Sequence, residues 1–558
     1  MIKVQGKKHL KFFASKKWYA TALVLILLAT LQEIIMESTD LVDNFFASSI
    51  QKNVHGYQEL FNEIKYIFGA DNIYHVKAVW DSWGLGNYVG YHYTAGQLAI
   101  NGVAASNQLY FIMFAILSGV CYGFGVFNAQ YYGAEKYKEL QQVTLLKIYV
   151  CLIICLIVLI LSQVCGYEMI SFTTTPKYAP RPEIVAQLKP EDKDLAIQWF
   201  KYFEYRAASI STLEGAEYFK IVALSYPLLA INIAFITTLR ETGRAGLAVW
   251  ISVIALSTNC FMNPFLIEPN FIANFNGIGV QGAAIATSTS RILQLVFIIV
   301  LFSYKRYKFI PRNWWHFDGY VTKRAFQKAW PIVLNEIFWS VGMVVQVKLR
   351  AYYSLDALTA NAIFSTIIAA LYTPLYHGFA AGTSVLVGSR LGANNLEEAE
   401  YNGKHLVILS FLVGIIAGLI LVAGGWFLPE LLFVNNTPET FRIAHWMLFA
   451  YGLWYPCLMI AATSYAIIIT GGAVMNAFVL DALFTWLVPV PLLAILIFTL
   501  NLDIIYIVLI MQSVDSLKAI WALIILKRKK WVKNLTETKH ITEFDNKVKR
   551  IKRNVKEM

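Results

Sequence analysis

Charged residues are scarce in this sequence: they make up 15% of it, whereas 57% of its residues are apolar. Ordinary soluble domains carry about 25% charged residues, so the composition excludes an ordinary soluble protein. The chain also lacks the GxxxxGK[ST] loop of nucleotide-binding proteins and the HExxH pattern of zinc enzymes. These absences argue against an enzyme, and against ATP as an energy source on this chain.

Cysteine and histidine are also few, with 6 and 9 residues. Nearly all the cysteines lie within apolar runs, and they show neither disulfide-framework nor zinc-ligand spacing. We therefore expect them to be small core residues, and the sequence predicts neither a metal site nor a cofactor.

Long apolar runs dominate the chain instead. Each can supply a helix of about 20 residues, which is what a bilayer core of about 30 Å requires. Six runs precede a basic break at residues 305–328, and six follow it. They cover residues 18–31, 98–129, 143–165, 221–239, 247–267, 280–302, 330–347, 358–387, 406–428, 443–470, 473–500 and 504–526. The fold class predicted is an all-α polytopic membrane protein with twelve transmembrane helices.

A glycine-rich apolar stretch that ends in a charged turn occurs twice. The turn follows Gly133 in the first half and Gly392 in the second, an offset of 259 residues (392 − 133). Internal repeats of this kind are typical of transporters built from two related helix bundles. We therefore expect two six-helix lobes related by pseudo-two-fold symmetry, at residues 18–304 and 329–526, joined by a linker at 305–328.

Basic residues concentrate at residues 1–17, 305–328 and 527–558. An even number of spans places these three segments on one face, and enrichment in Lys and Arg assigns that face to the cytoplasm. The net charge of +12 is then an orientation signal rather than a sign of nucleic-acid binding. The sequence predicts a multi-pass protein of the plasma membrane with both termini cytoplasmic. Its tail is either solvated or lies on anionic lipid headgroups.

The first half is longer than the second, and the extra residues fall in two segments, 49–96 and 171–217. Both segments are expected outside the cell. They either form a small external cap or are two unrelated surface insertions.

The first apolar helix carries four carboxylates, Glu33, Glu37, Asp40 and Asp43. At 100° per residue the first three share a stripe about 60° wide, and Asp43 lies about 80° to one side. An ionisable group in a spanning helix costs about 2.5 to 3.5 kcal/mol on insertion scales, which makes it a functional hypothesis. Carboxylates this close cannot all ionise in a poorly hydrated site, so the pattern suits a proton or cation site. Alternatively the stripe lies in the outer headgroup region, since the apolar run ends near Leu31.

Polar side chains also occur in later spans. Asn259 and Asn263 form an i,i+4 pair on one helix face, and Thr287 follows a run of small residues. In the second half the intramembrane polar groups are Asn335, Glu336, Gln346 and Asp481. We expect the first group to serve the cation site and the second to line a substrate cavity, although Asp481 could equally be a solvated helix-end residue.

Several segments resemble the multidrug and toxic compound extrusion (MATE) family. They are STDLVDNFFASSI, NAQYYGAEKYKE, LVGSRLGANNLEEA, LRETGRAGLAVWISVIALSTNCFMNPFLI, GIGVQGAAIATSTSR, LPEL, IIITGG and DALFTWLVPVPL. The resemblance covers nearly all of both halves and neither insertion. It implies two six-helix lobes around a central cavity, and export of cationic or amphipathic compounds in exchange for H⁺ or Na⁺.

By this resemblance Asp43 is the coupling carboxylate of the first lobe, with Asn259, Asn263 and Thr287 around it and with help from Asp40 or Glu37. Glu336 resembles an acid that some members place in span seven. The chain departs from the family at Asn263, where some members carry Asp, and this puts Na⁺ coordination in doubt.

The function predicted is a cation-coupled antiporter that exports small cationic or amphipathic molecules by alternating access, as a monomer. One rival is an exporter of lipid-linked oligosaccharides, which should carry several basic residues facing phosphates, whereas few lie within these spans. Another is a polytopic acyl- or glycosyltransferase, which should show a His or Asp motif at the membrane surface. A third is a non-transporting receptor that binds through the outer insertions.

Overall fold

The computed structural model describes residues 14–48, 50, 54, 95–174, 193–267, 277–305, 307–311, 313–315, 317–353, 355–432, 438–500 and 502–536. Over these residues the chain is helical and contains no strand. Most of the predicted insertion at 49–96, the first part of the insertion at 171–217 and most of the basic tail lie outside the described residues.

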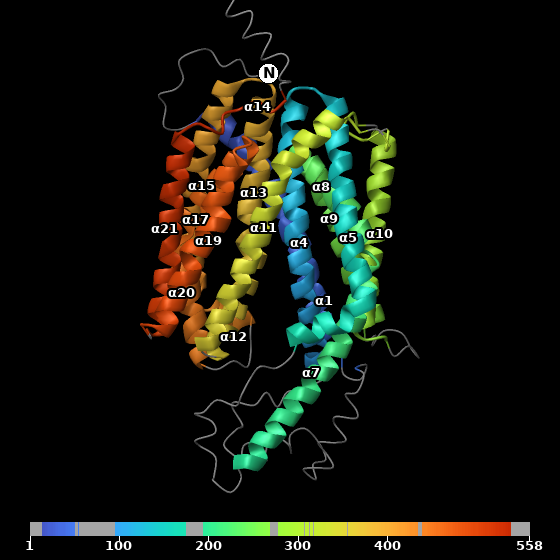
Figure 1. Ribbon diagram of the computed structural model, residues 1–558, viewed down its shortest axis with the longest axis vertical. Helices are drawn as coiled ribbons and strands as arrows, with labels where there is room; N and C mark the ends of the chain where they lie inside the picture. Colours follow the sequence, from blue (N-terminus) through green and yellow to red (C-terminus); the bar gives the residue numbers. More distant parts are fainter. Residues whose placement is uncertain are drawn as a thin grey trace, which may run out of the picture.

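Within the described residues, seven helices make up the first half, here called the first lobe (Figure 1). They are α1 (Lys16–Ser48), α4 (Ala95–Gly133), α5 (Tyr137–Thr174), α7 (Lys193–Ala223), α8 (Tyr226–Glu241), α9 (Ala245–Leu266) and α10 (Val280–Lys305). The span predicted at 221–239 is bent, because residues 208–223 of α7 meet α8 at 58°. Pro227 lies in the first turn of α8, where its missing N–H costs nothing, whereas it could not continue α7.

The second half forms the second lobe. Its elements are α11 (Gly319–Tyr353), α12 (Leu355–Leu371), α13 (Thr373–Thr383), η1 (Ser384–Gly388), α14 (Ser389–Gly392), α15 (Leu396–Gly424), α16 (Leu428–Leu432), α17 (Pro438–Thr470), α18 (Val474–Phe478), η2 (Val479–Leu483), α19 (Phe484–Leu487), α20 (Pro489–Phe498) and α21 (Ile504–Lys527). Both η elements are single π-helical turns, a feature frequent at functional sites. Within the described residues, eleven helices are long and apolar enough to cross a membrane, or twelve if the bent pair is one span.

α11 begins at Gly319, inside the stretch predicted as the linker. The Asp318 carboxylate explains this start, because it accepts hydrogen bonds from the backbone N–H of Tyr320 and Val321 at 2.7 and 3.2 Å. Such capping satisfies donors that a helix N-terminus leaves open.

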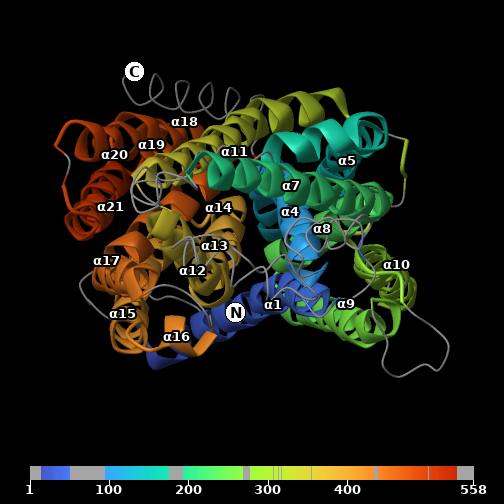
Figure 2. The same cartoon turned by 90° about the horizontal axis from the view of Figure 1, so that it is seen from below.

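Each lobe reaches into the core of the other through its first helix. Ala22 and Ile26 of α1 are buried in the core of the second lobe. Ala325 and Ala329 of α11 are buried in the core of the first. Farther along, α1 packs on α9, so that one helix contacts both lobes. Figure 2 shows α1 between α9 on one side and α12 and α13 on the other.

The repeated glycines lie where these helices cross. A Cβ placed on Gly123 of α4 would lie 2.7 Å from the Ala329 Cα of α11, and one on Gly382 of α13 would lie 2.8 Å from Ile26 Cγ1 of α1. Small residues allow two membrane helices to approach this closely. The repeat in the sequence therefore corresponds to two equivalent contacts between the lobes.

The two charged turns that follow the glycines meet at one end of the molecule, at the top in Figure 1. There the backbone at Gly133 packs against Ser389, and that at Gly392 packs against Gln130. The start of α1 and residues 528–536 lie at the same end, since Trp18 Nε1 donates to Asn402 at 2.9 Å and the Leu535 N–H donates to Gln130 at 2.6 Å. The basic segments, as far as the structure describes them, thus share one face.

Candidate functional site

Asp43 is the centre of a buried polar cluster in the first lobe. It lies in the last turns of α1 and is 2% exposed. Its Oδ1 accepts hydrogen bonds from Asn259 Nδ2 and Asn263 Nδ2, both at 2.8 Å, and its Oδ2 accepts one from Thr287 Oγ1 at 2.6 Å. The structure therefore brings together four of the residues predicted for the cation site.

Helix geometry explains the convergence. Asn259 and Asn263 are one turn apart on α9, so they present their amides to the same point of α1. The Asn263 amide also donates to Asn259 Oδ1 at 3.0 Å, and Asn259 Nδ2 lies 3.1 Å from Thr287 Oγ1 on α10. The contacts tie three helices to one carboxylate.

All the donors to Asp43 among the described residues are neutral. Arg291, one turn beyond Thr287 on α10, donates instead to Ser225 Oγ at 2.7 Å and lies over the Tyr226 ring. In addition, Asn263 Oδ1 is buried without a hydrogen-bond partner. A buried carboxylate without an ion-pair partner and an unsatisfied oxygen are both costly in an apolar setting, so a proton or a small cation at this point stabilises the site.

Of the other carboxylates of α1, Glu33 has a different partner from Asp43. Glu33 is buried and forms an ion pair with Arg240 of α8. Glu37 is half-buried on α1, and the hydrogen bonds to Asp43 come from α9 and α10 rather than from it. The side chain of Asp40 lies outside the described residues.

A second polar cluster lies in the second lobe. Asn335 Nδ2 donates to Asp481 Oδ2 at 3.0 Å and to the Tyr465 hydroxyl at 2.6 Å, and that hydroxyl donates to Glu336 Oε1 at 3.2 Å. Lys518 Nζ lies 2.5 Å from Asp481 Oδ1. Three of the four residues predicted for the substrate cavity thus belong to one network.

The π turn of η2 contributes to this cluster, because Asp481 lies in it and the N–H of Ala482 donates to Asn335 Oδ1 at 3.2 Å. Glu336 faces the first lobe, since a Cβ on Gly119 of α4 would lie 2.9 Å from its Cγ. Gln346 is separate: it is buried farther along α11, where its amide lies 3.9 Å from the Met343 sulfur.

Sequence reasoning did not identify several charged residues of the interior. Lys147 of α5, with 0% side-chain exposure, forms a 2.8 Å ion pair with Glu241 of α8, which also accepts from Asn128 at 3.0 Å. Lys518 of α21 pairs with Asp481. These partners are far apart in the chain, and the only available signal was a single charge within an apolar run. Among the described residues, no group of three or more His, Cys, Asp or Glu could hold a metal ion.

Comparisons with known proteins point to one family. The MatE family matches residues 87–182 and 331–499, in both lobes. Both halves of the chain are thus similar to the MATE family. In keeping with that similarity the chain is a multi-pass membrane protein, and a transporter rather than an enzyme. A curated relative is the probable multidrug resistance protein YoeA of Bacillus subtilis (strain 168), 20% identical over 419 residues, which cover 73% of this chain and 81% of the relative.

Solved structures of MATE transporters share the fold of this chain. An outward-facing multidrug resistance MATE family transporter of the MOP superfamily superposes with a TM-score of 0.66 at 14% identity, covering 94% of this chain and 99% of the other. A MOP superfamily transporter from Pyrococcus furiosus, described as having a binding pocket of reverse polarity, gives a TM-score of 0.66 at 15% identity, with 92% and 98% covered. These likenesses confirm the two-lobed helical fold.

Proposed function

We propose that this protein is a cation-coupled antiporter that exports cationic or amphipathic small molecules by alternating access, with Asp43 as the coupling carboxylate. The observation that supports the assignment is the buried Asp43 cluster, in which a carboxylate meets only neutral donors. Such a group gains most from taking up a proton or a small cation.

The position of α1 suggests how cation uptake reaches the rest of the molecule. α1 packs on α9 around Asp43 and on α13 of the other lobe. Neutralising Asp43 changes the hydrogen bonds from Asn259, Asn263 and Thr287, and with them the packing of α1. The cation then shifts the equilibrium toward the conformation of the two lobes that binds it more tightly. The size of the shift is set by the difference in cation affinity between the two conformations.

The entry of one cation down its gradient can drive substantial export of substrate. Moving one elementary charge through 100 mV is worth about 2.3 kcal/mol, which corresponds to roughly fifty-fold accumulation of substrate. We place the face that carries the basic segments in the cytoplasm, so that substrate enters from that side and leaves on the other.

For the substrate we propose the second cluster, with Glu336 as its principal acid. Both oxygens of Asp481 are engaged, one by Lys518 and one by Asn335. Glu336 receives one hydrogen bond from Tyr465 and lies against α4 of the first lobe. A cation bound there would contact both lobes.

The rival export of lipid-linked oligosaccharides is not favoured. Its substrate carries phosphates, which need free cations within the spans. Lys147, Arg240 and Lys518 are each paired with a carboxylate, and Arg291 donates to Ser225 Oγ. Arg350, which has no carboxylate partner among the described residues, lies near the end of α11 and within the second lobe rather than between the lobes.

The experiment is efflux from proteoliposomes under separate imposed H⁺ and Na⁺ gradients. The Asp43→Asn variant should lose gradient-driven efflux while retaining substrate counterflow, because Asn keeps the shape of the side chain and one acceptor oxygen but cannot take up the cation. Glu397→Gln, at an exposed carboxylate of α15, is the matched control and should behave as the wild type. Gradient-driven efflux that persists in Asp43→Asn overturns the assignment.

A further inference from the structure

Arg350, near the end of α11, lacks the acidic partner that Arg240 and Lys518 have. Its Nη1 donates to Asn361 Oδ1 of α12 at 3.0 Å, and no carboxylate of the described residues pairs with it. The residue is half-buried. A guanidinium in such surroundings keeps its charge, so it needs a counter-anion or solvent.

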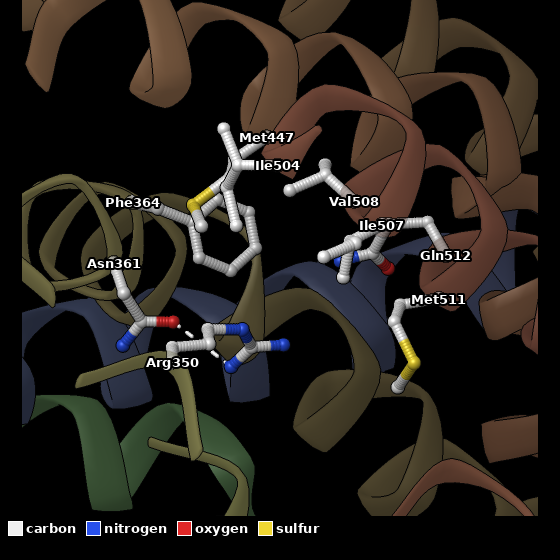
Figure 3. A pocket seen from close by; sticks show the side chains of 9 residues that line it. All are labelled: Arg350, Asn361, Phe364, Met447, Ile504, Ile507, Val508, Met511 and Gln512. Carbon is white, nitrogen blue, oxygen red and sulfur yellow. Dashed lines mark hydrogen bonds between the residues drawn. The ribbon is translucent and has the colours of Figure 1, made fainter. Parts of the chain in front are cut away.

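The guanidinium borders a small hollow of about 10 Å³, room for about one water molecule, between α11, α12, α17 and α21. Figure 3 shows it beside the Asn361 amide, with the Phe364 ring above and the Gln512 amide across the hollow. Most of the wall is apolar, and includes Met447 and Ile504. The site thus combines a cation, neutral polar groups and an apolar surface.

The depth of this hollow follows from helix length. Arg350 lies 31 residues along α11 from Gly319, which is about 46 Å at 1.5 Å per residue. A bilayer with its headgroups is about 40 to 45 Å thick. Arg350 therefore lies at the headgroup level on the face opposite to the charged turns.

The two lobes differ in polarity here. The offset that relates Glu33 to Glu336 is 303 residues (336 − 33), and the same offset relates Asp43 to Gln346 (346 − 43). The coupling carboxylate of the first lobe thus corresponds to an amide in the second, and Arg350 follows one turn later. Ala47 is its counterpart in the first lobe.

We propose that Arg350 and Asn361 bind the phosphate or carboxylate group of an anionic amphiphile at the mouth of this hollow. The planar guanidinium can hold two oxygens of such a group at once. The Gln512 amide supplies a further donor from the other side. This site is separate from the proposed coupling and substrate sites, and its test needs no transport.

The test is native mass spectrometry of the full-length protein in detergent with dioleoylphosphatidylglycerol or dioleoylphosphatidylcholine. Wild type should bind phosphatidylglycerol at least about tenfold more tightly than Arg350→Gln, and phosphatidylcholine should not distinguish them. Lys348→Gln is the matched control, because Lys348 is exposed two residues away, 5.7 Å from the Phe172 ring. Equal retention of phosphatidylglycerol by wild type and Arg350→Gln overturns the proposal.

Competition identifies the source of the anion. Displacement of the lipid by millimolar glycerol phosphate supports a site for the free head group, whereas retention supports one that needs the lipid chain as well.

Wild-type protein provides a measurement that does not depend on the folding of a variant. Phenylglyoxal modifies accessible guanidinium groups, and peptide mass spectrometry follows each arginine. Phosphatidylglycerol, but not phosphatidylcholine, should slow the modification of Arg350 several-fold. Arg390, with 46% side-chain exposure, lies at the opposite end and is the internal reference. Equal rates at Arg350 with both lipids contradict the proposal.

Discussion

The hydroxyl of Tyr122 lies 2.7 Å from Nδ1 of His377, and their rings are nearly parallel, at 7°. Tyr122 belongs to α4 in the first lobe and His377 to α13 in the second. The residue that follows His377 is Gly378, which packs against Thr30 of α1. One polar contact thus joins the lobes beside the crossing of α1 and α13.

Removing the Tyr122–His377 hydrogen bond should weaken the packing of the two lobes at the end where the two charged turns meet. Tyr122→Phe keeps the ring and deletes the hydrogen bond, whose net contribution is about 1 kcal/mol, so the closed population should fall roughly five-fold relative to open forms. Double electron–electron resonance between labels on the exposed residues Lys138 and Glu397 measures the change. Tyr506→Phe, at an exposed tyrosine, is the control. An unchanged distance distribution in Tyr122→Phe would show that the bond does not hold the lobes.

The repeated glycines allow a test of the symmetry. Gly123→Leu and Gly382→Leu should each prevent the lobes from closing, because a Cβ would lie 2.7 Å from Ala329 Cα or 2.8 Å from Ile26 Cγ1. Since the two contacts are equivalent, both variants should shift the same label distance in the same direction and depress transport. Gly319→Ala is the control, with nothing within 4 Å of the added carbon. A wild-type distance in either leucine variant speaks against close packing at that glycine.

The buried pair Lys147–Glu241 leads to a prediction on stability. Lys147→Met leaves the Glu241 carboxylate without its cation beside Asn128, and breaking a buried pair typically costs about 3 to 5 kcal/mol. Removing both charges, in Lys147→Met with Glu241→Leu, should recover most of that loss. Unfolding in mixed micelles with increasing dodecyl sulfate gives the comparison. A double variant no more stable than Lys147→Met alone would contradict an electrostatic origin.

Much of the architecture could be predicted from the sequence because membrane spans leave a strong local signal. A run of about 20 apolar residues has few alternatives to a transmembrane helix, and the glycine repeat predicted the two lobes. The contact of Asn259 and Asn263 with one partner also follows from helical spacing on α9. Their positions relative to Asp43 needed the resemblance to MATE proteins, because Asp43 lies on a different helix, α1.

The remaining features depend on tertiary contacts. Nothing local to Lys147 indicates Glu241, which lies 94 residues away, and the pair forms only because α5 packs on α8. The bend before α8 was missed because Pro227 lies inside an apolar run that reads as one straight span. The π turn around Asp481 likewise has no signature in sequence periodicity.

Lys518 should set the selectivity of the second cluster. Its Nζ lies 2.5 Å from Asp481 Oδ1 and so neutralises one of two carboxylates that Asn335 and Tyr465 connect. In Lys518→Met, Asp481 is available to a bound cation together with Glu336. Tetraphenylphosphonium should then bind about tenfold more tightly, about 1.4 kcal/mol, whereas neutral triphenylphosphine oxide should bind as before. Lys527→Met, at the exposed end of α21, is the control, and calorimetry on folded protein gives the affinities. Unchanged or weaker binding of the cation would mean that Lys518 has a structural role. In that case the double variant Lys518→Met with Asp481→Asn would restore stability without altering selectivity.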